Sequence, residues 1–225
     1  MKKRFLFVGI FVVVIILGLS ATLLLIPKNA TNEKLDKGIS ELKIDFQEQA
    51  LNQPDLSFSS NPYDYVKDNE NYRQIVTLGY KAIPAIQKKI ESSSENGLVE
   101  YTLAIAAEEI AQTDLKVVLD GQYKYETAKD FSVKWDSFTS DLKSNIKRVM
   151  DKEKDTTRRN KELESLGIFA LPYLVDEYKS GDDTLAEVIL NLSAKTPEIK
   201  GEYGNSKDVY KLINKNSRII SDLRA

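Results

Sequence analysis

The chain has 225 residues, 32 of them basic and 34 acidic, and it contains neither cysteine nor histidine. The absence of cysteine excludes disulfides and thiol chemistry. Together with the absence of histidine it also excludes a Ser-His-Asp triad and a zinc site built from histidine or cysteine. The mildly acidic balance, without a basic cluster, argues against nucleic-acid binding, which relies on neutralising phosphates.

The first feature along the chain is an uncharged apolar segment, residues 5–26, with Lys2, Lys3 and Arg4 before it and Pro27 after it. As a helix, a segment of this length reaches about 33 Å, enough for the roughly 30 Å hydrocarbon core of a bilayer. The basic residues before it indicate a cytoplasmic N-terminus. We therefore predict that residues 1–32 form a single-pass membrane anchor and linker, with the rest of the chain outside the cytoplasm.

A cleaved secretory signal is the alternative, because such signals share the basic start. Their apolar region is shorter, about 7–15 residues. A cut after Ser20 would leave an apolar new N-terminus and a secreted protein. No cysteine follows the segment, so lipid attachment through a cysteine is excluded.

Residues 33–60 are expected to form a stalk, or the first helix of the domain, followed by a loop. Apolar side chains recur there at steps of three and four residues, which is typical of one face of a helix. These side chains are Leu35, Ile39, Leu42, Phe46 and Ala50. Pro54 is expected to end the helix, because proline disfavours a helical residue before it.

A nine-residue pattern, LGxxA[IL]Px[IL], occurs twice, at residues 78–86 and 166–174. We expect Gly79 and Gly167 to end a helix in a left-handed conformation, which glycine adopts without steric cost. Pro84 and Pro172 should lie in the first turn of the next helix, where a missing N–H does no harm. Each copy therefore predicts a helix–turn–helix unit.

The similarity continues on both sides of the pattern. Amphipathic helices are expected before it, at residues 70–78 and 157–166, and apolar helices after it, at 98–111 and 184–194. A Gly-x-Tyr turn, at residues 121–123 and 201–203, then leads into long helices at 128–152 and 207–223. The sequence thus predicts an all-α protein: a transmembrane helix followed by a compact α-solenoid-like domain with an internal duplication, its two units covering residues 61–155 and 156–225.

The two copies of the pattern resemble HEAT-type repeats, the helical hairpins of α-solenoid proteins. The whole chain also resembles membrane-anchored cell-envelope proteins of Gram-positive-like bacteria. The resemblance implies protein binding or scaffolding and brings no catalytic residues with it. Residues 114–155 separate the two copies, so we expect a compact domain rather than a long superhelix.

Glu108 and Glu109 stand on an otherwise apolar stretch of a predicted helix, with Glu100 and Tyr101 about two turns earlier. We interpret the pair as the solvent edge of a core helix, because buried carboxylates are rare. The alternative is acid–base chemistry in a two-carboxylate hydrolase of the glycosidase kind. Nothing in the spacing favours that enzyme class, and we predict no catalytic residues.

Three aromatic residues are the candidate partner-binding residues: Tyr123, Tyr125 and Trp135. Trp135 shares one helix face with Phe131 and Phe138, which is typical of a core seam. If exposed, it would suit a binding hot spot or a sugar platform. The two tyrosines either pack with their hydroxyls at the surface or face a ligand.

No cofactor or metal is predicted. Asp182 and Asp183 lack the alternating ligands of a calcium loop and fit the N-terminal cap of the next helix better. No glycine-rich phosphate loop occurs. The charged run at residues 151–161 is expected to be the solvated boundary between the two units.

These observations lead to a functional hypothesis. The chain is expected to be a membrane-anchored, extracytoplasmic helical-repeat protein that acts as an interaction or scaffold module for another envelope protein, without nucleic acid. One alternative is a cell-wall glycan-binding protein or carboxylate hydrolase that uses Trp135. Another is a structural spacer that dimerises through Leu35, Leu42 and Phe46.

Overall fold

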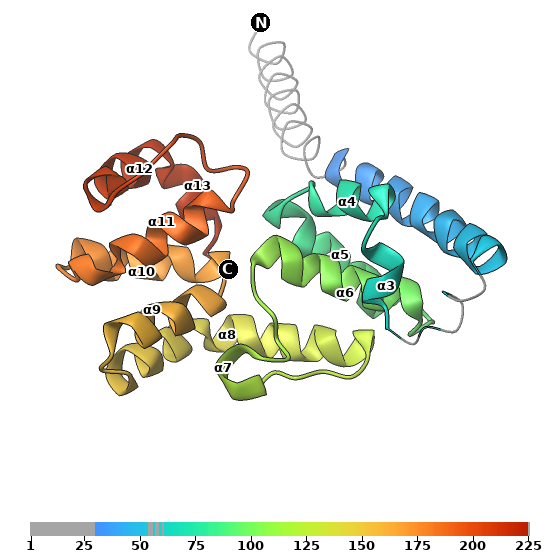
Figure 1. The fold of residues 1–225 in the computed structure, drawn as a ribbon, viewed down its shortest axis with the longest axis horizontal. Coiled ribbons are helices and arrows are strands. Elements are labelled where there is room, and N and C mark those ends of the chain that lie inside the picture. Colours follow the sequence, from blue (N-terminus) through green and yellow to red (C-terminus); the bar gives the residue numbers. More distant parts are fainter. Residues whose placement is uncertain (1–29, 54–55, 57–58, 60, 225) are drawn as a thin grey trace, which may run out of the picture.

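The computed structural model describes residues 30–53, 56, 59 and 61–224 (Figure 1). The predicted anchor at residues 5–26 lies outside this part of the chain. All regular structure in the described residues is helical and none of it is strand, which confirms the all-α class. No helix in this part combines the length and the apolar character that a membrane span needs.

Short connections join the helices. The first helix covers residues 30–52 and is called the N-terminal helix. The next helices are α3 (Tyr63–Val66), α4 (Glu70–Val76), α5 (Ile83–Ser92), α6 (Leu98–Ala111), α7 (Val118–Gly121) and α8 (Ala128–Lys152). They are followed by α9 (Thr156–Ser165), α10 (Leu171–Lys179), α11 (Ala186–Ala194), α12 (Val209–Lys215) and α13 (Ser217–Asp222). Four 3₁₀ turns interrupt the described series: η1 (Tyr80–Ala82), η2 (Ile168–Ala170), η3 (Asp183–Leu185) and η4 (Ser206–Asp208).

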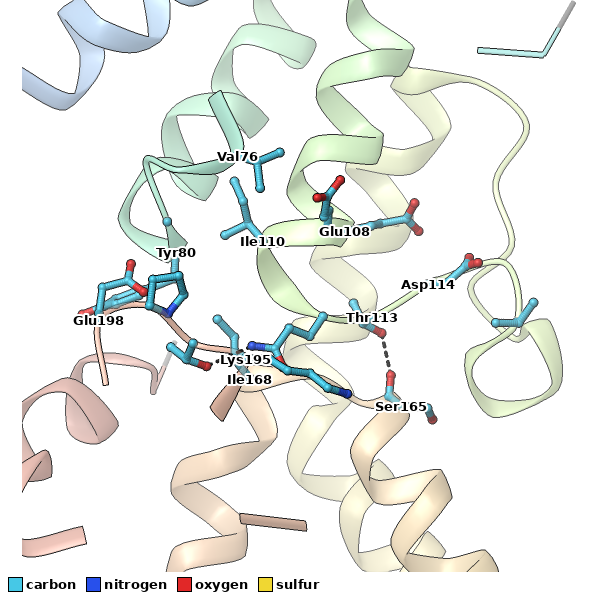
Figure 2. Close-up of a pocket in the computed structure, with 16 residues that line it drawn as sticks. Val76, Tyr80, Glu108, Ile110, Thr113, Asp114, Ser165, Ile168, Lys195 and Glu198 are labelled. Carbon is cyan, nitrogen blue, oxygen red and sulfur yellow. Dashed lines mark hydrogen bonds between the residues drawn. The ribbon is translucent and has the colours of Figure 1, made fainter. Parts of the chain in front are cut away.

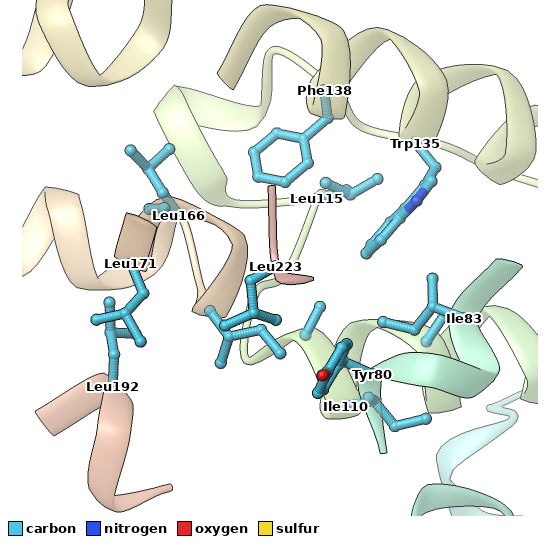
Figure 3. Packing of buried hydrophobic residues seen from close by; sticks show 14 of the residues in the cluster. Tyr80, Ile83, Ile110, Leu115, Trp135, Phe138, Leu166, Leu171, Leu192 and Leu223 are labelled. Atoms are coloured by element: carbon cyan, nitrogen blue, oxygen red, sulfur yellow. The ribbon is translucent and has the colours of Figure 1, made fainter. Parts of the chain in front are cut away.

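Helix α8 joins two groups of helices. The N-terminal helix and α3 to α6 form one group, and α9 to α13 form the other (Figure 1). Helix α8 packs against α5 and α6 in the first group, and against α9 and η2 in the second. Figure 3 shows the resulting core, where Trp135 and Phe138 of α8 lie close to side chains of both groups. One continuous cluster of buried apolar residues therefore spans both predicted units.

The two copies of the nine-residue pattern adopt the same local backbone. Gly79 has φ 71° and ψ −172°, and Gly167 has φ 76° and ψ −170°. The positive φ agrees with the prediction, but the extended ψ differs from a left-handed helical residue, and this combination is essentially restricted to glycine. A 3₁₀ turn follows each glycine, and Pro84 and Pro172 lie in the first turn of the next helix, as predicted.

The last predicted helix, residues 207–223, is broken, so that prediction was wrong. Helix α12 ends at Lys215 and α13 begins at Ser217. Asn216 lies between them, buried, with φ −114° and ψ 18°. Its side-chain oxygen accepts the Lys200 N–H at 2.9 Å, and its amide donates to the Leu212 carbonyl at 3.0 Å. The break arises because an asparagine side chain offers the backbone an alternative to the helical ladder.

The N-terminal helix packs against the helices that follow it. Leu35 and Leu42 are fully buried, and Phe46 packs edge-on against Tyr65 with ring centres 5.7 Å apart. Asp45 accepts hydrogen bonds from the side-chain amides of Asn69 and Asn71, at 2.9 and 3.0 Å. The stripe that the spacer hypothesis would use for dimerisation is therefore already covered by the same chain.

Candidate functional site

A hollow of about 630 Å³ lies where the end of α6 meets the turns of both pattern copies (Figure 2). We call it the groove. It is lined by Val76, Gly79, Tyr80, Glu108, Glu109, Ile110, Gln112, Thr113, Asp114, Val117, Ser165, Ile168, Lys195, Thr196, Pro197 and Glu198. Its walls come from both groups of helices, so only the folded chain brings them together.

Hydrogen bonds from the end of α6 to residues far away in the sequence fix the groove. Gln112 ends the helix in a left-handed conformation, and its side-chain amide donates to the Thr196 hydroxyl at 2.9 Å. The Thr113 hydroxyl donates to the Ser165 carbonyl at 2.8 Å, which Figure 2 shows across the groove. Gly167 leaves room for this approach, because a Cβ atom there would lie 2.2 Å from the Ala111 carbonyl oxygen.

The lining of the groove combines apolar side chains with acids. The apolar members are Val76, Ile110, Val117, Ile168 and Pro197. Among the charged members, Glu109, Asp114 and Lys195 are exposed, Glu198 is half-buried and Glu108 is buried. Lys195 is the only basic residue among the lining residues given above. The groove therefore offers an apolar surface with a mainly negative rim.

Glu108 is a structural carboxylate rather than the solvent edge of its helix, so that interpretation was wrong for this residue. Only 4 % of it is exposed. Its two oxygens accept the Leu115 N–H and the Tyr125 hydroxyl, both at 2.7 Å. Burial raises the pKa of Glu108, although these hydrogen bonds and the nearby Lys116 act in the opposite direction. Glu109 points to the exposed side and accepts the Tyr72 hydroxyl at 2.5 Å.

The carboxylates do not form an evident acid–base pair. A general acid must present its proton to a substrate. Both oxygens of Glu108 are instead engaged by donors of the same chain. Glu100 is also engaged, because it accepts the Gly97 N–H and the Ser93 hydroxyl at the start of α6.

The described residues contain no cluster of acidic side chains that could hold a metal ion. Asp182 accepts the Thr184 N–H at 3.2 Å. It therefore caps the turn before α11, as the sequence suggested.

The three candidate partner-binding residues lie in the core. Tyr123, Tyr125 and Trp135 are 3 %, 2 % and 5 % exposed. The Trp135 ring packs between Phe131 and Phe169, with ring centres 5.4 and 6.1 Å away. Direct contact with a partner would require these side chains to leave the core, so partner binding through them stays a prediction and the structure gives them a packing role.

One feature that sequence reasoning missed is a cage of three tyrosines around Lys116. The Lys116 Nζ atom lies 4.5 Å from the ring centre of Tyr125, 5.1 Å from Tyr101 and 5.4 Å from Tyr63. It also lies 3.4 Å from the Tyr63 hydroxyl. Burial lowers the pKa of Lys116, but the hydroxyls of Tyr101 and Tyr63 and the charge of Glu108 outweigh it and leave the pKa raised. The lysine therefore stays charged among the rings.

The segment that carries Lys116, residues 112–121, has an unusual backbone. Gln112, Leu119 and Asp120 have φ values of 60°, 51° and 59°, and they are the only non-glycine residues with positive φ in the described part of the chain. A left-handed conformation costs an ordinary residue about 1–2 kcal/mol. The surrounding structure must therefore hold this segment in place. No motif in the sequence predicted its backbone conformation.

Fold and site together define an all-α protein with one shared core and an acid-rimmed groove. Comparison with protein-family models, with curated proteins and with solved structures found no match. The resemblance to HEAT-type repeats and to envelope proteins therefore stays a prediction from sequence.

Proposed function

We propose that this protein is a membrane-tethered, extracytoplasmic module that binds a segment of another envelope protein in its groove. The observation that carries the proposal is the groove itself, an apolar hollow of about 630 Å³ between the two pattern copies. Both oxygens of Glu108, the buried carboxylate of the lining, accept hydrogen bonds from the same chain, which favours binding over catalysis at this residue.

The lining also suggests the character of the bound segment. Apolar side chains of the partner would fill the surface formed by Val76, Val117 and Pro197. The acids at the rim, Glu109 and Asp114, would attract basic residues on either side, because complementary charge steers association and fixes register. The ligand we propose is therefore an apolar peptide segment flanked by lysine or arginine.

The tether rests on sequence alone. The apolar length of residues 5–26 and the three basic residues before it support a single-pass anchor with the helical domain outside the cytoplasm. An envelope protein in the same membrane or at its surface would then meet the groove at high local concentration. The HEAT-like pattern also supports a role as a protein-binding scaffold.

The glycan-binding and hydrolase alternatives gain no support from the groove. The only tryptophan of the chain is buried on α8 and does not line the groove. A sugar platform needs an exposed aromatic face. The Tyr80 side chain lines the groove but is itself 6 % exposed.

A photocross-linking amino acid at position 117 tests the proposal. Val117 lines the groove and is 66 % exposed, whereas Val133 on α8 is 64 % exposed and does not line the groove. With the full chain expressed in its native membrane, we expect discrete cross-linked products from position 117 and none of the same size from position 133. Products are separated by electrophoresis and identified by mass spectrometry.

A charge reversal supplies the second half of this test. Asp114→Lys removes negative charge from the rim at an exposed position. It should lower the yield of the cross-linked product from position 117 several-fold, because the partner is held partly by charge. Equal products from positions 117 and 133, or a yield insensitive to the reversal, would contradict binding in the groove.

A further inference from the structure

We infer that Tyr63, Tyr101 and Tyr125 form a binding site for a primary ammonium group, that Lys116 occupies it as an intramolecular ligand, and that this occupancy fixes residues 112–121 as one wall of the groove. The cage would set the shape of the groove whether or not the groove binds a protein partner.

The geometry of the cage is that of a cation site. Aromatic faces attract an ammonium group within about 6 Å of the ring centre, and the attraction grows when water is excluded. All three tyrosine ring centres lie within this range of the Lys116 Nζ atom, and Tyr63 also accepts a hydrogen bond from it through the hydroxyl, at 3.4 Å. Buried Glu108 adds a negative charge close by, since it accepts the hydroxyl of Tyr125. The cage thus combines three rings with one carboxylate around a single cation.

The three rings come from distant parts of the chain. Tyr63 begins α3, Tyr101 lies in the first turns of α6, and Tyr125 follows α7. The rings of Tyr101 and Tyr125 pack against each other at an interplanar angle of 43°, with ring centres 5.7 Å apart. Lys116 therefore connects the loop after α6 to two other elements, which a solvated surface lysine would not do.

Lys116 lies inside the segment that shapes the groove. Gln112, Thr113, Asp114 and Val117 line the groove on either side of it. Val117, Leu119 and Asp120 also line a second hollow of about 420 Å³ between this segment, α8 and α9. A shift of the segment would change both hollows together.

The segment needs external contacts to hold its shape. Leu119 and Asp120 have left-handed backbones, which side chains other than glycine rarely adopt. Leu115 and Val118 anchor the segment in the core. Lys116 lies between these anchors and next to Val117, which is itself largely exposed. We therefore expect the contact between Lys116 and the cage to set the positions of Val117 and Asp114 at the groove.

The site accepts a ligand class, not only this lysine. A primary alkylammonium ion, or the lysine side chain of another molecule, presents the same charged group to the rings. Such a ligand would compete with Lys116 for the three rings, and residues 112–121 would then be free to move. The cage would then couple binding of an ammonium group to the width of the groove.

Chemical rescue in a spin-labelled chain tests this inference. The chain contains no cysteine, so Val117→Cys and Lys195→Cys place two labels on residues that line the groove, one within residues 112–121 and one directly after α11, in the full chain. The distance between them is measured by double electron–electron resonance. With Lys116 present, we expect one narrow distance distribution. Lys116→Ala should broaden or shift it.

The fragment that Lys116→Ala removes is propylammonium. Adding propylammonium chloride should restore the narrow distribution in this variant, whereas 1-propanol and sodium chloride at the same concentrations should not. Lys124→Ala removes an exposed lysine from the same region and should leave the distribution unchanged. Restoration by the ammonium ion alone supports the cage as an ammonium site.

Two results would overturn the inference. One is an unchanged distribution in Lys116→Ala, and the other is an equal response to propylammonium and to propanol. If the alanine variant does not fold, Lys116→Met takes its place, because it keeps the alkyl stem and removes the charge. A broader distance distribution between the labels in Lys116→Met supports the inference, and a wild-type distribution refutes it. Because these distances are read without a partner, their outcome is separate from the cross-linking at position 117.

Discussion

At the scale of single residues, Glu108 shows how packing changes the meaning of a charged side chain. It stands one position from exposed Glu109, yet it is buried and accepts hydrogen bonds from Leu115 and Tyr125. The hydrogen bond from the Leu115 N–H holds residues 112–121 against the end of α6, and the hydrogen bond from the Tyr125 hydroxyl holds the segment after α7 against the same carboxylate. Burial nevertheless raises the pKa of Glu108, so the ionised form opposes folding relative to the neutral one.

The raised pKa of Glu108 predicts how the stability of Glu108→Gln, relative to the wild type, depends on pH. The ordinary pKa is 4.5, and the folded value lies above it. Above the pKa of Glu108 in the folded state, the ionised carboxylate lowers the stability of the wild type. As the pH falls through this folded-state pKa, Glu108 takes up a proton and the wild type regains stability. Below pH 4.5, the ordinary pKa, the destabilisation is gone. The stability of Glu108→Gln minus that of wild type should therefore fall between pH 7.5 and pH 4.5, by about 1.4 kcal/mol for each unit of pKa shift.

Urea unfolding of the full chain at a series of pH values measures this difference, with the fluorescence of Trp135 as the signal. Glu109→Gln is the matched control, because it removes a charge from the exposed side of the same helix. A difference that stays constant or grows as the pH falls would show that burial of the Glu108 carboxylate does not govern stability.

At the scale of elements, the N-terminal helix is a core element with a regular face. Its buried positions include Leu35 and Leu42, while Ile44 on the opposite side is 54 % exposed. Gly38 faces α4, because a Cβ atom added at Gly38 would lie 2.9 Å from the side chain of Ile75. A helix of this kind contributes to folding through its buried face, because most helical stability in proteins comes from the packing of an amphipathic face.

Two substitutions in this helix separate a core element from a free stalk. Leu42→Ala should lower the free energy of unfolding by about 2–5 kcal/mol, because it leaves a cavity in the core. Ile44→Ala, at an exposed position, should change it by less than about 0.5 kcal/mol. Urea unfolding measures both. Two small and equal effects would instead indicate that the helix does not belong to the cooperative core.

At the scale of the whole molecule, the two groups of helices meet around α8 and at the end of α6. Gly167 lies in close contact with the other group, since a Cβ atom there would lie 2.2 Å from the Ala111 carbonyl oxygen. Gly79 has the same backbone conformation, but a Cβ atom there would meet only the side chain of Glu198, at 1.9 Å. A side chain can move away, whereas the end of a packed helix cannot.

The two glycine positions therefore predict unequal costs. Gly79→Ala and Gly167→Ala should both lose about 1–3 kcal/mol of stability, because alanine is strained where positive φ is combined with an extended ψ. Gly167→Ala should lose about 1–3 kcal/mol more, because overpacking pushes the two groups of helices apart. Urea unfolding measures the losses, and equal losses would mean that the junction adapts freely.

The local structure was largely determined by the sequence. Periodic apolar residues predicted helices at 98–111 and 128–152 with the observed bounds, because amphipathic spacing and capping residues act within a few turns. The paired glycine and proline of the repeated pattern predicted both turns. The same reasoning failed at Asn216, whose hydrogen bond to the Lys200 N–H depends on a loop that only the folded chain brings near.

The site was decided by the tertiary structure. The burial of Glu108, the cage around Lys116 and the groove each join residues that are far apart in the chain, and periodicity carries no information about such pairs. Tyr125 illustrates the difference, because its sequence allowed either packing or ligand contact, while its hydrogen bond to Glu108 fixes it in the core. Helices follow from local spacing, whereas charge burial and cavities follow from which helices pack together, and that is a property of the whole fold.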